Sequence, residues 1–195
     1  MLGASSLGKR FGSRWIFRGL DFSLEKGDVL LVTGNNGSGK STLLKVLMGL
    51  LSPTEGNVHR PKGEIRRTMG YAALDLAVYP SLSAKEHLDL AAKLRGCPTD
   101  PSARLTQVGL ELAIHQPVGQ FSSGMRARLK FALAVQASPA VLILDEPSAS
   151  LDRIGEATLA SLIEDQKKRG VTILATNDPQ DRRFATHELE IQPLG

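Results

Sequence analysis

The sequence predicts an α/β fold in which a mainly parallel sheet is interrupted by a helical insertion. Three short segments, 28–33, 141–145 and 171–176, are almost continuously apolar, which is typical of strands buried on both faces of a parallel sheet. Segments with helical periodicity lie between them, as the connections of parallel strands require. From 74 to 138 the pattern is helical throughout, and we therefore place the insertion there.

The first part of the chain predicts mostly strands, with one helix among them. Alternating polar and apolar residues indicate the first strand, and a Lys26-Gly27-Asp28 turn separates it from the next. Proline and glycine at 53–56 end the helix. The expected elements are strands at 15–24, 28–33, 56–60 and 68–73 and a helix at 40–51.

The second part of the chain predicts helices first, and then strands alternating with a helix. Serines can cap two of the helices at their N-termini, and the helix at 101–112 places Leu105, Val108 and Leu112 on one face. The expected elements are helices at 83–95, 101–112, 122–137 and 155–169 and strands at 141–145, 171–176 and, at a sheet edge, 187–192.

Composition limits the classes of protein to which the chain can belong. With 195 residues, 42% of them hydrophobic, it is long enough for one domain with a substantial core. A net charge of +4 is compatible with phosphate ligands, a membrane surface, nucleic acid or an ordinary protein surface. The single cysteine excludes an intramolecular disulfide, and we expect neither a signal peptide nor a membrane-spanning segment. Any path across a membrane would then belong to another chain.

Residues 34–42 match the phosphate-loop pattern G-x-x-x-x-G-K-[ST] between an expected strand and an expected helix. Glycines let the backbone N–H groups point at an anion, and the helix N-terminus adds its dipole. Lys40 can reach the β- and γ-phosphates of a nucleoside triphosphate, and the Ser41 hydroxyl can ligate Mg2+. A glycine-rich turn without a ligand is the alternative, and the strand–helix context argues against it. The expected nucleotide-binding residues are Asn35, Asn36, Gly37, Ser38, Gly39, Lys40, Ser41 and Thr42.

Two carboxylates, Asp145 and Glu146, end the apolar strand at 141–145. In phosphate-loop enzymes such a strand lies beside the phosphate-loop strand, and we expect the same pairing here. Asp145 would then hold Mg2+, and Glu146 suits a general base that polarises the attacking water. A pair of acids that merely start a helix ahead of Pro147 is the alternative.

A third motif, Phe121-Ser122-Ser123-Gly124-Met125, precedes a helix just upstream of the acidic strand. Here the chain resembles the ABC ATPases, whose signature usually is Leu-Ser-Gly-Gly-Gln; Ser122 and Gly124 agree with it. Two hydroxyls and a glycine at a helix N-terminus form an anion site. In that family the site faces the nucleotide of a second subunit. The resemblance therefore implies that Ser122, Ser123 and Gly124 bind nucleotide in a homodimer or with a paired ATPase subunit.

The resemblance extends from about residue 7 to residue 191, and it implies one ABC ATPase domain spanning 1–195. Such a domain combines a P-loop NTPase core (1–73 and 139–195) with a helical subdomain (74–138), and has an antiparallel β portion on its N-terminal side. Residues 149–152 resemble the loop that crosses the dimer interface. Among the branches of the family, the pattern is most similar to the haem-exporter or cytochrome c maturation ATPases.

The resemblance gives Phe11 a role in nucleotide binding and shows that Leu74 and Asn177 differ from the family's usual residues. Phe11 matches the aromatic residue that stacks on adenine, with a core phenylalanine as the alternative. Leu74 stands where the family has a glutamine that contacts Mg2+ and the attacking water, and leucine cannot ligate a metal. Asn177 stands where the family has a histidine at the γ-phosphate; it can donate a hydrogen bond but carries no charge. We therefore expect hydrolysis that is slow, with Asp75 as a candidate substitute for the glutamine.

The leading hypothesis is an ATP-hydrolysing subunit, with ATP and Mg2+ as ligands, that powers transport through a separate transmembrane permease. It would lie in the cytoplasm, peripheral to the inner face of the membrane, with residues 74–93 receiving the permease. One alternative is a catalytically weak ATP-binding module that needs a second ATPase subunit. Another is a soluble non-transport ABC protein acting on nucleic acid or ribosomes. Those proteins usually have two cassettes or a long coiled coil, so no nucleic-acid partner is expected.

Overall fold

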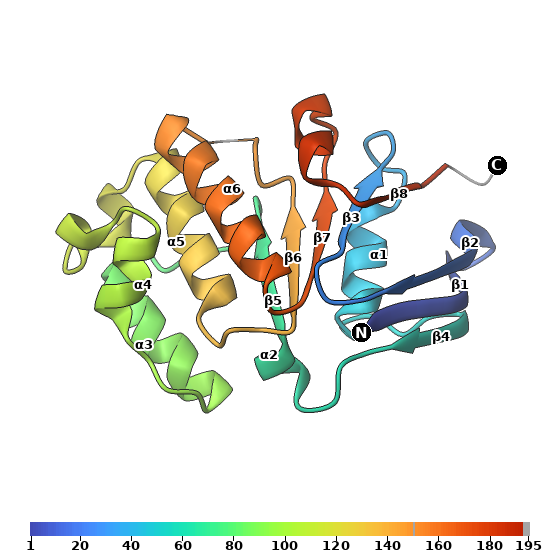
Figure 1. Cartoon of the computed structure of the whole chain (residues 1–195), viewed down its shortest axis with the longest axis horizontal. Coiled ribbons are helices and arrows are strands. Elements are labelled where there is room, and N and C mark those ends of the chain that lie inside the picture. The colour runs from blue at the N-terminus through green and yellow to red at the C-terminus, as the bar shows by residue number, and fades with distance from the viewer. Residues whose placement is uncertain (150, 193–195) are drawn as a thin grey trace.

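A fully parallel five-stranded sheet forms the centre of the molecule (Figure 1), seen in a computed structural model that describes residues 1–149 and 151–192. The strand order is β5-β6-β7-β3-β8, and every neighbouring pair is parallel. This confirms the predicted α/β class and the edge position of the last strand. The strands are β3 (Val29–Thr33), β5 (Met69–Ala73), β6 (Val141–Asp145), β7 (Val171–Ala175) and β8 (His187–Glu190).

A second, antiparallel sheet has the order β2-β1-β4 and lies on the N-terminal side of the molecule, as expected. Its strands are β1 (Leu2–Phe11), β2 (Arg14–Leu24) and β4 (Glu55–His59). The sequence did not predict β1. Register shifts after Ala4 and after Leu7, with a left-handed Ser6 (φ 48°) between them, break the alternation of buried and exposed residues on which such a prediction depends.

Helices cover the two faces of the parallel sheet differently (Figure 1). On one face α1 packs between the sheet and the antiparallel strands; on the other lie α5 and α6, with α3 and α4 further out. A single-turn helix, α2, precedes β5. The helices are α1 (Lys40–Leu47), α2 (Ile65–Thr68), α3 (Ala84–Arg95), α4 (Pro101–Gln107), α5 (Ser123–Val135) and α6 (Arg153–Lys167).

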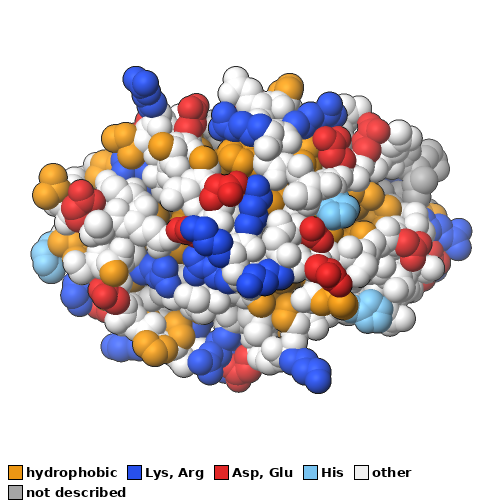
Figure 2. Space-filling view, in the orientation of Figure 1, with side chains coloured by type: hydrophobic (Ala, Val, Ile, Leu, Met, Phe, Trp, Pro, Cys, Tyr) orange, Lys and Arg blue, Asp and Glu red, His pale blue; other side chains and the backbone are white. Residues whose placement is uncertain are grey.

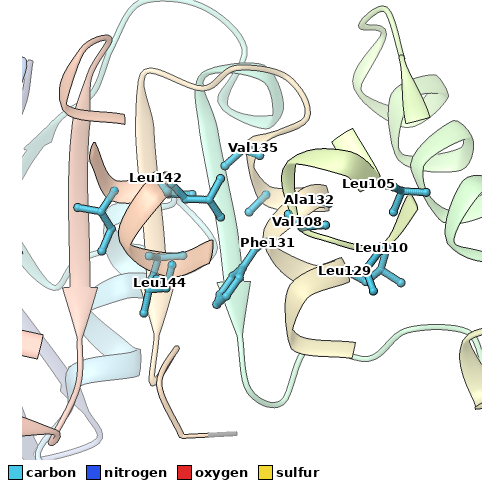
Figure 3. Packing of buried hydrophobic residues seen from close by; sticks show 14 of the residues in the cluster. Leu105, Val108, Leu110, Leu129, Phe131, Ala132, Val135, Leu142 and Leu144 are labelled. Carbon is cyan, nitrogen blue, oxygen red and sulfur yellow. The ribbon is translucent and has the colours of Figure 1, made fainter. Parts of the chain in front are cut away.

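Helix α5 joins the helical part of the chain to the sheet because it is buried on two sides (Figure 3). Phe131 and Val135 point toward the strands, where Leu142 belongs to the same hydrophobic cluster. Leu129 points the other way, toward Leu105 of α4. A shift of α5 would therefore disturb both packing surfaces at once.

Two predicted helices are shorter than expected because each meets a glycine in the left-handed region. The helix predicted at 40–51 ends at Leu47, with Gly49 at φ 73°. The helix predicted at 101–112 ends at Gln107, with Gly109 at φ 66°. Leu112 consequently leaves the face of Leu105 and is 98% exposed.

The acidic strand does not lie beside the phosphate-loop strand, and that prediction is wrong. Strand β7 is inserted between β6 and β3. The backbone N–H of Glu146 donates to Ala175 O (2.8 Å), and that of Thr176 donates to Val32 O (3.2 Å). The ends of three strands therefore meet in the order β6, β7, β3, which places the residue after Thr176 between the acids and the phosphate loop.

Charged side chains near the end of α6 form a cluster on one face (Figure 2). Lys167 pairs with Glu164 at 2.7 Å and Lys168 with Asp165 at 2.8 Å, each within the last turns of the helix. Basic residues at this end also complement the helix dipole.

Within residues 1–149 and 151–192, no helix is both long enough and apolar enough to cross a bilayer.

Candidate active site

The phosphate loop connects β3 to α1 and depends on glycine for its shape. Gly34, Gly37 and Gly39 have φ values of 141°, 79° and 112°, a region that other residues rarely adopt. A Cβ atom on Gly39 would also lie only 2.3 Å from Cγ2 of Ile16. Gly39 is the N-cap of α1 and brings no side-chain hydrogen bond to it. The first N–H groups of α1 are therefore free of a side-chain cap, as an anion site at a helix N-terminus requires.

Lys40 lies across this loop, and its side chain is held by three groups from different segments. Its Nζ donates to Gly34 O at 2.8 Å and to Asn177 Oδ1 at 3.1 Å, and lies 3.5 Å from Glu146 Oε1. Lys40 is only 6% exposed, so its charge is little screened by water. A phosphate group would replace these oxygens as the partner of the ammonium group.

Asp145 has the burial and the free carboxylate oxygen expected of a metal ligand. It is buried, and its Oδ1 has no hydrogen-bond partner. Burial raises the pKa of its carboxyl, and the Ser41 hydroxyl opposes this by lowering the pKa; the charge of Asp75 raises it further. An unpartnered buried carboxylate oxygen next to a hydroxyl is a donor set that Mg2+ accepts. The residues present therefore fit this ion.

Glu146 leaves the strand by adopting a left-handed backbone conformation. Its φ of 49° is uncommon for a residue with a side chain and is a form of strain found at functional sites. The turn directs the side chain toward the end of β7, where Oε2 accepts a long hydrogen bond (3.4 Å) from the N–H of Asn177. Both carboxylates thus lie at the same edge of the sheet although they are consecutive in sequence.

Asn177 bridges the two sides of the site. Its Nδ2 donates to Asn36 Oδ1 at 2.7 Å, while its Oδ1 accepts from Lys40. The side chain therefore engages the phosphate loop from the end of β7. This bond uses one of the two N–H groups of Nδ2.

A hollow of about 300 Å³ collects most of the expected phosphate-loop residues together with Glu146. Ile16 of β2 also lines it, and sequence reasoning did not single this residue out. Phe11 is not among the lining residues; it is 50% exposed, with Lys9 Nζ 4.9 Å from the centre of its ring. The lining residues are Ile16, Asn36, Gly37, Gly39, Lys40, Ser41, Thr42 and Glu146.

Two expected phosphate-loop residues lie elsewhere. Ser38 is buried, and its Oγ has no hydrogen-bond partner. Asn35 lines a separate polar hollow of about 540 Å³ that also includes Asn177.

The signature residues Ser122, Ser123 and Gly124 lie at the start of α5, apart from the phosphate loop. Ser122 is the N-cap, and its Oγ accepts from Met125 N at 3.1 Å; Ser123 is the first helical residue. Gly124 is buried against the adjacent loop, because a Cβ atom there would lie 2.9 Å from Oδ2 of Asp152. Of the predicted interface loop 149–152, Ser150 lies outside the described residues.

Ser123 does line a second cavity, of about 140 Å³, that reaches Asp145 and Glu146. Leu74 lies on its wall and is itself 53% exposed. The polar contact of Leu74 is made by its backbone: Leu74 O accepts from Lys130 Nζ. At this position the side chain offers no polar atom to a metal or to water.

Comparison with known proteins identifies the family. The family described as ABC transporter matches residues 17–149. The chain belongs to the ABC transporter family.

Curated relatives agree with this assignment. The chain is 36% identical over 188 residues to the cytochrome c biogenesis ATP-binding export protein CcmA of Cupriavidus necator. This alignment covers 91% of the chain and 83% of the relative. CcmA of Brucella abortus is 37% identical over 184 residues (91% and 86%). The lantibiotic transport ATP-binding protein SrtF of Streptococcus pyogenes is 35% identical over 183 residues (91% and 80%).

Solved structures show the same fold. An ATP-binding subunit of an ABC transporter superposes with a TM-score of 0.84 at 24% identity, over 98% of this chain and 85% of the other. A dimeric ATP-binding cassette in a post-hydrolysis state, bound to ADP and phosphate, gives 0.83 at 20% identity, over 98% and 94%. These likenesses show the ABC ATPase fold. The family match and the curated relatives show that the protein is an ATP-binding subunit of an ABC transporter.

Proposed function

We propose that the chain binds ATP with Mg2+ and hydrolyses it slowly, as one of two nucleotide-binding subunits attached to a transmembrane permease. The observation that carries this proposal is the convergence of Lys40, Glu146 and Asn177 within hydrogen-bond or ion-pair distance, next to the unpartnered oxygen of Asp145. These groups supply cation, base, hydrogen-bond donor and metal ligand for phosphoryl transfer to water.

Asp145 and Ser41 are the residues we assign to the metal. Mg2+ bound there would neutralise charge on the β- and γ-phosphates. Lys40 would exchange its contacts with Gly34 O and Asn177 for phosphate oxygens. The exchange is favourable because both of these acceptors are neutral, whereas a hydrogen bond between an ammonium group and a phosphate is charge-assisted on both sides.

Glu146 is the residue we assign as general base. For this role it must accept a proton from water, so its ion-pair contact with Lys40 has to give way to the nucleotide. Asn177 would orient the γ-phosphate through the N–H group of Nδ2 that does not bond Asn36. Its neutral amide stabilises developing negative charge less than a charged donor would.

Two residues make slow hydrolysis the expected outcome. Leu74 brings no polar atom to the second cavity, so one ligand for the attacking water is missing on that side. Asn177 brings a neutral amide to the γ-phosphate, where the family's histidine could carry a positive charge. The same observations favour a second candidate, an ATP-binding module whose turnover depends on a more active partner subunit.

The assembly is proposed from the family and from the signature. The dimeric cassette of the same fold supports pairing of two subunits, in which Ser122, Ser123 and Gly124 would contact the partner's nucleotide. The division into a core (1–73 and 139–195) and a helical subdomain (74–138), which would receive the permease, belongs to this proposal. A peripheral position on the inner face of the membrane follows from it, without a nucleic-acid partner.

Among cargoes, the proposal favours export of the kind named for the CcmA relatives. Two of them are 36% and 37% identical to the chain over 91% of its length. SrtF, at 35% identity, serves lantibiotic transport. Proteins with such different cargoes share this domain, which supports the view that the permease selects the cargo.

The decisive experiment compares wild type with Glu146→Gln. We expect the variant to bind ATP with near wild-type affinity and to lose at least about 100-fold in hydrolysis, the range seen for removal of a general base. Light scattering of the variant with ATP and Mg2+ should show a shift from monomer to dimer. Wild-type hydrolysis by Glu146→Gln would remove this residue as the base. If ATP binds but no dimer forms, a different ATPase subunit would be its mate.

A further inference from the structure

The two loops that carry Glu146 and Asn177 are joined by a side-chain contact that the mechanism above does not use. The hydroxyl of Ser148 lies 2.8 Å from each carboxylate oxygen of Asp181. Ser148 follows Glu146 and Pro147 on the first loop. Asp181 lies in a short 3₁₀ helix, η3 (Pro179–Phe184), directly after the loop of Asn177.

Asp181 is unusual because its carboxylate is buried. The residue is 2% exposed, and the side-chain partner that the structure gives its carboxylate is Ser148. A carboxylate taken out of water is stable only where donors replace the lost hydration. The hydrogen bond from Ser148 is therefore strong, and it penalises any movement that separates the two loops.

The second loop is well defined by itself. Asp178 N donates to Thr176 Oγ1 (2.9 Å), and Asp178 Oδ1 accepts from Gln180 N (2.9 Å). These bonds fix the turn after Asn177 against the end of β7. Asp181 is thus presented at a fixed position relative to Asn177.

The first loop is held much less firmly by its own backbone. The bonds from Ala149 N to Glu146 O and from Leu151 N to Ser148 O are both 3.4 Å long. Glu146 at its start has the uncommon φ of 49°, which the surroundings must maintain. The backbone N–H of Glu146 holds the start of this loop to Ala175 O of β7 (2.8 Å), and beyond Glu146 the short contact of Ser148 with Asp181 ties it to the second loop.

We propose that Asp181, acting through Ser148, is a positioning residue for ATP hydrolysis: it sets the distance and orientation between Glu146 and Asn177. Glu146 Oε2 and the N–H of Asn177 are 3.4 Å apart, and this gap depends on how the two loops are fastened. The inference rests on the proposed roles of Glu146 and Asn177. It adds two residues that touch neither the phosphate-loop hollow nor the second cavity.

The test is a graded series at the two positions. Ser148→Ala removes the donor, Ser148→Thr keeps a hydroxyl, and Asp181→Asn keeps an acceptor without the charge. Thr158→Val is the matched control, because the Thr158 hydroxyl is also buried and donates to a backbone oxygen within α6, away from the site. Single-turnover phosphate release, with protein in excess over ATP, separates the chemical step from nucleotide binding.

We expect Ser148→Ala to slow the chemical step about tenfold, the loss that one hydrogen bond to a charged group implies. Asp181→Asn should be slowed less, Ser148→Thr should approach wild type, and Thr158→Val should match wild type. ATP affinity should change by less than about twofold in all of them, since the Lys40 contacts are untouched. A purely structural contact would instead lower the melting temperature of Ser148→Ala and leave the chemical rate unchanged.

Hydrogen exchange gives a readout that does not need turnover. Ser148→Ala should increase amide exchange at 146–149 and 176–181 and leave the phosphate loop at 34–42 unchanged. Unchanged exchange and an unchanged chemical rate would overturn the inference. The proposed function is tested separately by Glu146→Gln: if that variant hydrolyses ATP normally, the proposal for the site fails, whatever Ser148 does.

Discussion

The phosphate loop and the segment after β5 flank the same acids, Asp145 and Glu146, but they contribute to the site in different ways. The phosphate loop brings Lys40, which is 6% exposed and held by oxygens from three segments. The segment after β5 brings Leu74, which is 53% exposed and uses only its backbone oxygen in a polar contact. The part proposed to bind triphosphate thus has its side chains in place, whereas the part proposed to order the attacking water lacks one. Binding and hydrolysis should therefore respond separately to mutation.

The largest effect is expected at the phosphate loop. Lys40→Ala should weaken ATP binding roughly 100-fold, since hydrogen bonds from one ammonium group to two phosphates are lost. Isothermal titration measures the affinity. Lys45→Ala, an exposed lysine on the same helix, is the control and should bind like wild type. Equal affinity of the Lys40 variant and wild type would contradict the assignment of the loop.

The next effect concerns Asp145 and the metal. Asp145→Asn should lose at least about tenfold in Mg2+-dependent ATP affinity, as loss of groups around a metal commonly does. Mn2+ binding followed by electron paramagnetic resonance measures the metal directly, without turnover. If the variant keeps full metal affinity, Asp145 is not a ligand.

The same substitution should have the opposite effect on the stability of the free protein. Burial raises the pKa of Asp145 in the folded state, so the folded chain keeps this proton to higher pH than the unfolded chain. Stability therefore falls as pH rises from the unfolded pKa, about 3.9, through the folded pKa. Asp145→Asn should melt higher than wild type at pH 7, and the difference should shrink toward pH 3. A lower melting temperature at pH 7 would contradict this.

The contrast between the two regions also explains what the sequence could predict. The phosphate loop and the two acids were predictable because their chemistry depends on residues that are close in sequence, such as Gly34 to Ser41. The loop of Leu74 was recognised only because leucine stands where the family has a glutamine. The hydrogen bond of Asn177 to Asn36 and that of Ser148 to Asp181 join residues that follow different strands. No local sequence pattern predicts such contacts.

Topology was the other limit. The apolar pattern of 171–176 predicts a buried strand but not its neighbours, and only the structure places β7 between β6 and β3. Strand β1 was missed because bulges around Ser6 disturb its alternation. Ile16 lines the phosphate-loop hollow only because β1 and β2 form a sheet beside α1.

A gain of function at Leu74 tests the segment after β5, which lacks a polar side chain for the attacking water. Leu74→Gln should raise hydrolysis about fivefold, as expected from one added hydrogen bond of about 1 kcal/mol to water in the transition state. ATP affinity should stay within about twofold of wild type, because the phosphate loop is unaltered. Leu74→Met is the control for shape, and phosphate release is the measurement. If both variants hydrolyse like wild type, the rate is limited elsewhere, with Asn177 as the next candidate.

The smallest effect is expected where the nucleotide base would lie. Phe11→Ala should weaken ATP binding about threefold, less than the usual range for stacking of a base on an aromatic ring, because the ring is half exposed. Phe11→Trp should restore the affinity, since any aromatic face can stack. Ile16→Ala is the informative comparison, because Ile16 lines the phosphate-loop hollow and Phe11 does not. A larger loss for Ile16→Ala than for Phe11→Ala would assign the base to the face of β2. A lower melting temperature for Phe11→Ala at unchanged affinity would make Phe11 a packing residue.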